Sequence, residues 1–276
     1  MRTWFITGAS RGFGALIAQE ALEKGDAVVA TARDPKSVTK RLGNHPNLLA
    51  VALDVTQESQ AHAAAKAAVE RFGRIDILVN NAGYGLLGAV EEASAEEIEA
   101  VYRTNVFGLL AVTRAVLPHM RQQRSGRVLN ISSLGGYRGI AGWGIYCSTK
   151  FAVEGLSEAL AQELAPLGVH VTAVEPGYFR TDFLDQSSLS TVPTVIDDYH
   201  QSSGAMRTFA PGVNHQQPGD PAKLAKVLVK FADTPNPPVR LPLGSDTVAA
   251  IEKKDAETAQ IITAWRSTAV STDFAQ

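Results

Sequence analysis

The chain has few of the residues that support disulfide bonds, metal binding or contact with polyanions. Cys147 is the only cysteine in 276 residues, which excludes an internal disulfide. The six histidines show no spacing typical of a metal site, so we expect no metal. The formal net charge is only −2, which gives no electrostatic reason to expect a nucleic acid or an anionic membrane as partner.

Long apolar runs and linker-like segments are also missing. The sequence contains no run of about 18 apolar residues, and therefore predicts no membrane-spanning helix. A strand that begins at Thr3 leaves no room for a signal peptide, so we expect a cytoplasmic location. No Pro-, Ser- or Gly-rich linker and no internal repeat divides the chain. With 45% apolar and 20% charged residues, residues 1–276 are expected to form one domain.

Apolar runs alternate with helical patterns along the chain. Runs typical of buried strands lie at residues 3–7, 27–31, 48–53, 77–80, 127–131, 169–174 and 239–241. Helical periodicity is found at residues 15–22, 57–72, 95–120, 146–165 and 222–231. This alternation favours an α/β fold, a doubly wound, Rossmann-like parallel sheet of about seven strands with helices on both faces. In such sheets ligands bind at the carboxyl ends of the strands.

A glycine-rich turn follows the first expected strand. Residues 8–14 read Gly-Ala-Ser-Arg-Gly-Phe-Gly and lead directly into the helical pattern at 15–22. Glycines let a backbone approach a pyrophosphate closely, and the N–H groups at a helix N-terminus favour its negative charge. The order of strand, glycine turn and helix therefore predicts dinucleotide binding, the alternative being a tight turn that binds nothing.

Tyr146 and Lys150 stand four residues apart, so a helix that begins there would place both side chains on one face. A phenol with an ordinary pKa of about 10 exchanges protons poorly at neutral pH. A fixed ammonium group one turn away stabilises the phenolate, and we expect Lys150 to lower the pKa of Tyr146. Taken alone, the pair could equally be a buried tyrosine beside a solvated lysine.

Together these motifs resemble those of the short-chain dehydrogenase/reductase superfamily along nearly the whole chain. Residues 7–14 match its cofactor turn, residues 80–83 its strand-stabilising Asn-Asn-Ala-Gly motif, and residues 176–181 the segment that contacts the nicotinamide end. In that family Asp54 would accept a hydrogen bond from the adenine amine. The expected cofactor-binding residues are Gly8, Ser10, Arg11, Gly12, Phe13, Gly14, Arg33, Asp54, Val55, Asn81, Ala82, Gly83, Tyr146, Lys150, Pro176, Gly177 and Thr181.

The resemblance also implies a catalytic tetrad of Asn105, Ser133, Tyr146 and Lys150. The family spacing, thirteen residues before the tyrosine, selects Ser133 rather than Ser132. Ser133 would bind the substrate carbonyl, and Tyr146 would deliver a proton to its oxygen as hydride reaches the carbon. Lys150 would also hydrogen-bond the nicotinamide ribose, and Asn105 would hold a water that links Lys150 to solvent.

Charges near the end of the second expected strand favour NADP(H) over NAD(H). NAD-binding versions of the fold place a carboxylate there for the ribose 2′-hydroxyl, whereas a 2′-phosphate needs cations. Ala32 occupies that position, and Arg33 together with Arg11 could clamp a 2′-phosphate. Asp34 would support NAD(H) if the strand ended two residues later. Both arginines could instead be solvated surface charges.

Apolar and aromatic residues near the tetrad predict an apolar substrate pocket, although they could equally be core or interface residues. The candidate lining residues are Leu134, Tyr137, Trp143, Tyr178 and Phe183. They favour an apolar ketone or aldehyde, or the corresponding secondary alcohol. The long polar segment at about 182–220 is typical of an active-site lid.

Residues at about 245–276 are expected to form a C-terminal helix that covers the substrate cleft or packs at a subunit contact. By analogy with the family, a homo-oligomer, either a dimer or a tetramer, is expected. The leading hypothesis is an NADP(H)-dependent carbonyl reductase or alcohol dehydrogenase. The alternatives on the same scaffold are a non-catalytic, NADPH-sensing regulator and a dehydratase or epimerase that keeps its cofactor tightly bound.

Overall fold

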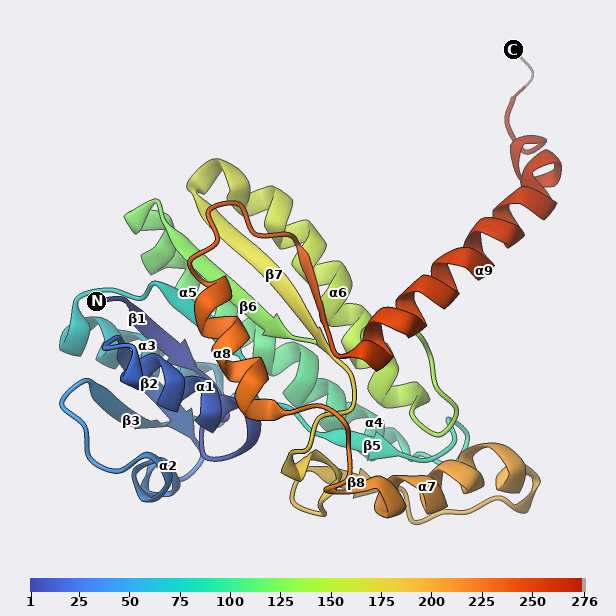
Figure 1. The fold of residues 1–276 in the computed structure, drawn as a ribbon, viewed down its shortest axis with the longest axis horizontal. Helices are drawn as coiled ribbons and strands as arrows, with labels where there is room; N and C mark the ends of the chain where they lie inside the picture. The colour runs from blue at the N-terminus through green and yellow to red at the C-terminus, as the bar shows by residue number, and fades with distance from the viewer. Residues whose placement is uncertain (275–276) are drawn as a thin grey trace.

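The computed structural model describes residues 1–274 and shows a parallel sheet between two layers of helices (Figure 1). The strands are β1 (Thr3–Ile6), β2 (Ala27–Ala32), β3 (Leu48–Ala52), β4 (Ile77–Asn80), β6 (Gly126–Ile131), β7 (Val169–Pro176) and β9 (Arg240–Leu243). Their order across the seven-stranded sheet is β3-β2-β1-β4-β6-β7-β9. The predicted doubly wound fold is confirmed, and the chain direction across the sheet reverses between β1 and β4, where such folds bind ligands.

Helices cover both faces because the central strands are apolar on both faces. One layer consists of α1 (Gly12–Glu23), α2 (Pro35–Leu42) and α8 (Pro221–Phe231). The other consists of α3 (Glu58–Phe72), α5 (Leu109–Gln123) and α6 (Gly144–Leu164), which continues as the 3-10 turn η3 (Ala165–Leu167). In β1, Trp4 and Ile6 belong to the core of the first layer and Phe5 to that of the second. Strands buried in this way read as continuous apolar runs.

The helix expected at residues 95–120 is interrupted by a wider turn. It consists of α4 (Ala95–Tyr102), the π-helical stretch η1 (Arg103–Gly108) and α5. Ser94 and Glu97 cap α4 reciprocally, because each side chain accepts a hydrogen bond from the backbone N–H of the other. The π-helical stretch carries the buried Asn105, and such stretches are frequent at functional sites.

The expected lid at 182–220 folds into short elements that are anchored to the body. They are η4 (Asp182–Leu184), β8 (Leu189–Thr191), η5 (Asp197–Tyr199), η6 (His200–Gly204) and α7 (Ala205–Val213). The strand β8 pairs in parallel with β5 (Gly85–Leu87). The carboxylate of Glu92 accepts hydrogen bonds from the N–H groups of Ile196 and Ala89 and from Arg207 of α7. Burial alone would raise the pKa of Glu92, but these bonds outweigh it and hold the pKa at about 2.

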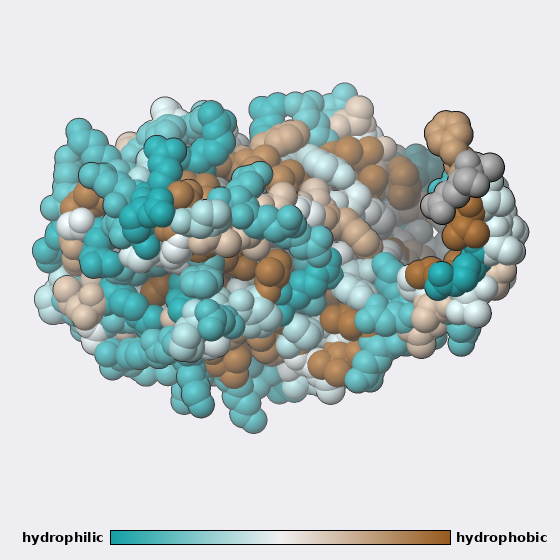
Figure 2. All heavy atoms as spheres, turned by 90° about the horizontal axis from the view of Figure 1, so that it is seen from above, coloured by the Kyte–Doolittle hydropathy of each residue, from teal (hydrophilic) through white to brown (hydrophobic). Residues whose placement is uncertain are grey.

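The C-terminal helix α9 (Ser245–Val270) runs away from the body of the protein (Figure 1). Near its start Lys254 donates a hydrogen bond to the carbonyl of Tyr137. Farther along, Ile261 and Trp265 are largely exposed, and Figure 2 shows hydrophobic atoms on this projecting arm. Residues 275 and 276 of the expected extension lie outside the described residues. None of the helices between residues 1 and 274 combines the length and apolar character that crossing a membrane requires.

Candidate active site

A cavity of about 840 Å³ extends along the carboxyl ends of the strands, from the glycine turn after β1 to Tyr146 on α6. This volume lies within the range typical of ligand sites. The expected cofactor-binding residues that line it are Gly8, Ser10, Arg11, Gly12, Phe13, Arg33, Asp54, Val55, Asn81, Ala82, Gly83, Tyr146, Lys150, Pro176, Gly177 and Thr181. Of the expected set, Gly14 is missing from the lining. The helix α9 contributes no lining residue either, so within the described chain it does not cover the cavity.

Gly14 allows close packing behind the glycine turn. A Cβ atom on Gly14 would lie 2.4 Å from the carbonyl oxygen of Gly8 and 2.6 Å from Nδ2 of Asn81. Gly8 itself has φ of +65°, a left-handed conformation that favours glycine. Gly12 and Phe13 form the first turn of α1 and line the cavity, and the N-cap residue of this helix makes no side-chain capping bond. Its first N–H groups are thus suited to a phosphate.

Asn80 and Asn81 connect β4 to its neighbours. Nδ2 of Asn81 donates to the carbonyl of Thr7 at 2.9 Å, which holds the end of β1 against the end of β4. Nδ2 of Asn80 donates to Oγ1 of Thr113 on α5 and to Oδ1 of Asn130 on β6, both at 2.9 Å. Both bonds of Asn80 are buried. The Asn-Asn pair therefore fixes the strand ends that form the floor of the cavity.

Ser133, Tyr146 and Lys150 meet at one end of the cavity. Ser133 comes just after β6, whereas Tyr146 and Lys150 lie on the first two turns of α6. Both α6 side chains are buried, and all three residues line the cavity. Nζ of Lys150 lies 5.8 Å from the centroid of the Tyr146 ring and donates to the carbonyl of Ile131 at 2.8 Å. Folding thus brings a phenol, a hydroxyl and an ammonium group to one place.

The expectation that Lys150 lowers the pKa of Tyr146 is not met in this geometry. Burial raises the pKa of Tyr146 well above its ordinary value, and the Ser133 hydroxyl opposes only part of that rise. The ammonium of Lys150 hydrogen-bonds the carbonyl of Ile131 and not the phenol, so any stabilisation that its charge gives the phenolate is smaller than the cost of burial. Burial also lowers the pKa of Lys150 to about 8, and the charge of Glu154 opposes this fall. Tyr146 is therefore a neutral phenol that has a proton to donate.

Asn105 lies behind the cavity wall and does not line it. Its Oδ1 accepts a hydrogen bond from the N–H of Tyr84 at 3.1 Å. Its Nδ2 donates to the carbonyl of Tyr84 at 2.9 Å and to Oγ1 of Thr149 at 3.2 Å. Both ends of the amide are engaged, so Asn105 fixes the backbone beside Gly83 against α6. The water-holding role implied by the resemblance stays a prediction.

Four of the five expected substrate residues line the cavity: Leu134, Trp143, Tyr178 and Phe183. The rings of Trp143 and Phe183 lie 5.7 Å and 5.5 Å from the Tyr146 ring, measured between centroids. The fifth, Tyr137, follows the 3-10 turn η2 (Leu134–Gly136) and lies outside the cavity. Its hydroxyl donates to Asp255 of α9, which does not line the cavity either. The expectation for Tyr137 is therefore corrected.

The charged side chains considered for the choice between NADP(H) and NAD(H) differ in whether another protein group already binds them. Arg33 lines the cavity and is exposed to solvent. The carboxylate of Asp34 accepts a hydrogen bond from the N–H of Lys36 at 3.0 Å and so caps α2, outside the cavity lining. The guanidinium of Arg11 donates to Oγ of Ser188 at 2.8 Å, which connects the glycine turn to the lid.

A family comparison supports what this geometry indicates. The family model described as short chain dehydrogenase matches residues 2–191. The chain belongs to the short-chain dehydrogenase family. As a member of that family it is an oxidoreductase that acts on a carbonyl or alcohol group.

Relatives match this dehydrogenase over most of its length. Oxidoreductase BOA17 of Botryotinia fuckeliana is 42% identical over 249 residues, which cover 90% of this chain and 90% of that protein. A 3-ketodihydrosphingosine reductase of Bacteroides thetaiotaomicron is 39% identical over 240 residues, covering 87% and 86%. The crystal structure of a short-chain dehydrogenase from Streptomyces avermitilis superposes with a TM-score of 0.92 at 39% identity and covers 99% of each chain.

Related structures contain nicotinamide cofactors of both kinds. A 3-ketoacyl-(acyl-carrier-protein) reductase from Brucella melitensis, complexed with NADH, has a TM-score of 0.71 at 27% identity and covers 88% of this chain and 96% of its own. The protein ElxO, with NADP bound, has a TM-score of 0.73 at 27% identity, with 90% and 99% covered. A nicotinamide cofactor is therefore typical of such relatives, and NAD and NADP both occur.

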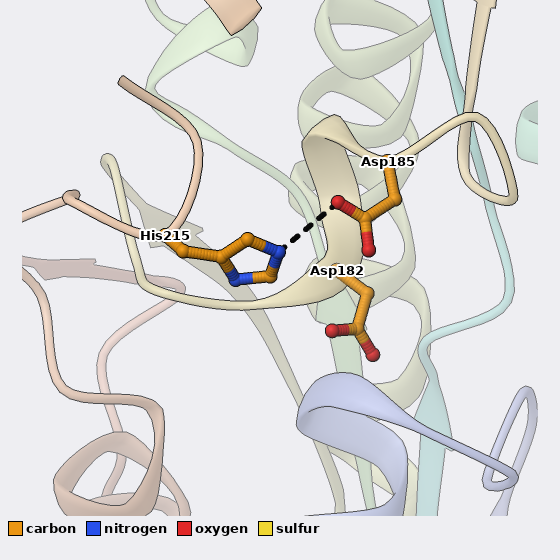
Figure 3. Close-up of side chains that lie close together, drawn as sticks. All are labelled: Asp182, Asp185 and His215. Carbon is orange, nitrogen blue, oxygen red and sulfur yellow. Dashed lines mark hydrogen bonds and ion pairs between the residues drawn. The ribbon is translucent and has the colours of Figure 1, made fainter. Parts of the chain in front are cut away.

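Tertiary packing brings residues into the site that the sequence analysis did not single out. Gln217 and Cys147 line the cavity, and no local pattern points to Gln217, which approaches from the far end of the lid. Also near the lid, Asp182, Asp185 and His215 lie together (Figure 3), with Nε2 of His215 3.2 Å from Oδ1 of Asp185. This contact joins the two ends of the lid, and sequence spacing does not reveal it because the residues are far apart in the chain.

Proposed function

We propose that this dehydrogenase is NADP(H)-dependent and interconverts an apolar ketone or aldehyde and its alcohol. The observation that carries the proposal is the meeting of Ser133, Tyr146 and Lys150 at one end of a single cavity whose other end is the glycine turn. A cofactor that extends along this cavity would place its reactive ring beside the phenol. The strand ends on either side of the β1–β4 switch point support this orientation.

The residues present fit a dinucleotide. A Cβ atom on Gly12 would meet no other atom within 4 Å, so the turn is open where a pyrophosphate would approach. The first N–H groups of α1 would hold the phosphates, Asp54 would receive the adenine amine, and Thr181 would contact the nicotinamide end. When bound, the nicotinamide would supply or accept the hydride.

The side chains of the chain itself would handle the proton. Ser133 would donate a hydrogen bond to the substrate carbonyl oxygen and hold it beside Tyr146. Because burial raises its pKa, Tyr146 keeps its proton until that oxygen becomes basic, and then transfers it. The ammonium of Lys150, one turn away, would stabilise the phenolate left behind. The oxidation of an alcohol would use the same groups in reverse.

The charges near β2 support NADP(H). Arg33 is open to solvent at the cavity edge, where the 2′-phosphate of the adenine ribose would lie. Asp34 is engaged as the cap of α2, which weakens the NAD(H) alternative. Because Arg11 is bonded to the lid, we assign the main phosphate contact to Arg33.

The substrate end of the cavity supports an apolar compound. Trp143 and Phe183 surround Tyr146 together with partly buried aliphatic side chains such as Leu184 and Met206. The name of the 3-ketodihydrosphingosine reductase indicates that one relative reduces a keto group. We therefore expect a ketone or aldehyde whose remaining surface is largely hydrocarbon.

The decisive experiment follows the loss of NADPH or NADH absorbance when purified protein is given ketones, aldehydes, quinones and steroids. We expect turnover with NADPH and an apolar ketone, and Tyr146→Phe should lower kcat/KM by about 10²- to 10⁴-fold. Tyr199→Phe makes the same change on the lid, outside the cavity lining, and should have little effect. Cofactor binding without turnover would favour the sensing regulator, and product without net cofactor consumption would favour the dehydratase or epimerase.

A further inference from the structure

Two glutamates are buried behind the catalytic end of the cavity. Glu154 on α6 is 2% exposed, and Glu175, the residue before Pro176 in β7, is 1% exposed. Across the described chain, neither carboxylate oxygen of Glu154 has a hydrogen-bond partner, and neither does Oε2 of Glu175. Carboxylate oxygens without partners are costly to bury in the charged form. Burial accordingly raises the pKa of both carboxyl groups.

The guanidinium of Arg240 contacts both Glu154 and Glu175. Nη1 of Arg240 lies 3.3 Å from Oε1 of Glu175, and its Nε lies 3.8 Å from Oε2 of Glu154. Its Nη2 pairs with Glu158 on the surface at 2.8 Å, so one cation is shared among three carboxyl groups. Burial raises the pKa of Glu175 to about 7, the charge of Glu154 adds to this rise, and Arg240 opposes it. Because each acid disfavours the charge of the other, binding of one proton by the pair leaves a single negative charge beside Arg240.

The charged and titratable groups that act on this pair come from several elements. They are Lys150 and Glu158 on α6, Arg240 on β9, and Tyr137 after η2, which in turn contacts Lys254 and Asp255 of α9. Among them Lys150 is the buried cation without a paired carboxylate among the described residues. Glu154 follows Lys150 by four residues, so the two lie one turn apart on the buried face of α6.

We propose that Glu154 is a positioning residue whose negative charge, one turn away on α6, keeps Lys150 protonated for the oxidoreductase reaction. This inference rests on the proposed function, in which the Lys150 ammonium stabilises the Tyr146 phenolate. Burial pulls Lys150 toward the neutral amine, and a fixed negative charge one turn away opposes that loss. Without this charge, Lys150 loses its proton nearer neutral pH, and activity falls at a lower pH.

Four variants of unchanged side-chain length test this arrangement. They are Glu154→Gln, Glu175→Gln, the double variant, and Glu158→Gln as the matched control, because Glu158 contacts the same arginine from the surface. The first readout is an NMR titration of the lysine ammonium groups, in which Lys150→Met identifies the Lys150 signal without any need for turnover. The second is the pH dependence of kcat/KM with NADPH and the best ketone of the substrate screen.

We expect Glu154→Gln and the double variant to lower the pKa of Lys150, and with it the alkaline limb of kcat/KM, by on the order of one pH unit. Glu175→Gln removes a like charge beside Glu154 and should not lower either value, and Glu158→Gln should match the wild type. An unchanged Lys150 titration in Glu154→Gln, or an equal fall in Glu175→Gln, would overturn the proposal. A shifted titration in a protein that reduces no carbonyl would instead refute the proposed function and leave the charge pairing standing.

Discussion

Replacement of Gly14 by alanine tests the contact that shapes the cofactor turn. The added Cβ would lie 2.4 Å from the carbonyl oxygen of Gly8 and 2.6 Å from Nδ2 of Asn81, closer than real Cβ contacts allow. The Gly8 backbone and the Asn81 amide are both fixed, because Nδ2 of Asn81 donates to the carbonyls of Thr7 and Gly8. The clash must therefore be relieved by a shift of α1 or of the turn.

A second glycine in a helix, Gly155, serves as a control that separates the stability cost of the Gly14 clash from the gain in helix propensity. Gly155 lies on the exposed side of α6, and a Cβ there would meet nothing within 4 Å. Gly155→Ala should raise the free energy of unfolding by about 1 kcal/mol, because alanine is the better helix former. Gly14→Ala gains at most the same amount but incurs an overpacking cost of about 1–3 kcal/mol. The difference between the two variants should therefore be about 1–3 kcal/mol.

Urea unfolding measures this difference, and isothermal titration calorimetry with NADPH measures its functional effect. We expect Gly14→Ala to bind NADPH more weakly than the wild type, because the displaced turn no longer presents its N–H groups to the phosphates. Gly155→Ala should bind as the wild type does. If both variants were equally stable and bound NADPH equally well, close packing of α1 against the turn would not shape the site.

Two further substitutions test the cofactor edge and the lid. Arg33→Ala should raise KM for NADPH by about 10- to 100-fold, because one charge-assisted contact with the 2′-phosphate is lost. KM for NADH should stay unchanged. Lys36→Ala, outside the cavity lining, is the control. An equal rise in KM for both cofactors in Arg33→Ala would contradict the assignment of Arg33 as the contact for the 2′-phosphate. Because the folded-state pKa of Glu92 is about 2 against an ordinary 4.5, its stabilising effect is complete above 4.5 and is lost as the pH falls through 2. Glu92→Gln lacks this effect throughout, so its unfolding free energy should fall less steeply in acid; a slope equal to that of the wild type would show that Glu92 does not anchor the lid.

The sheet could be predicted well because its strands are short apolar runs with clear ends. The starts and ends of β4 and β1 agree with the expected runs to within one residue. Periodicity could not reveal the π-helical stretch η1, because the apolar spacing continues across it and only the hydrogen-bond pattern changes. The elements of the lid escaped prediction because their stability comes from contacts such as Glu92 with Arg207, which are distant in sequence.

The residues of the site that follow strand ends could be predicted from the sequence, whereas properties that depend on burial, such as pKa values, could not. The four-residue spacing predicts Tyr146 and Lys150, the family resemblance adds Ser133, and folding brings the three together. The direction of the Tyr146 pKa was wrong, because spacing shows which charge is near but not how completely the phenol is desolvated. Glu175 could have been noticed as a charge in an apolar strand run, although its buried partner Glu154 could not have been inferred from that run.

The projecting helix α9 carries a tryptophan whose fluorescence can report binding at this helix. Trp4 and Trp143 are buried, whereas Trp265 on α9 is 63% exposed. Iodide in solution should therefore quench the red-edge emission of Trp265 and spare the other two indoles. Any molecule that covers the arm would shift that emission to the blue and shield it from iodide, so binding there can be followed without a label.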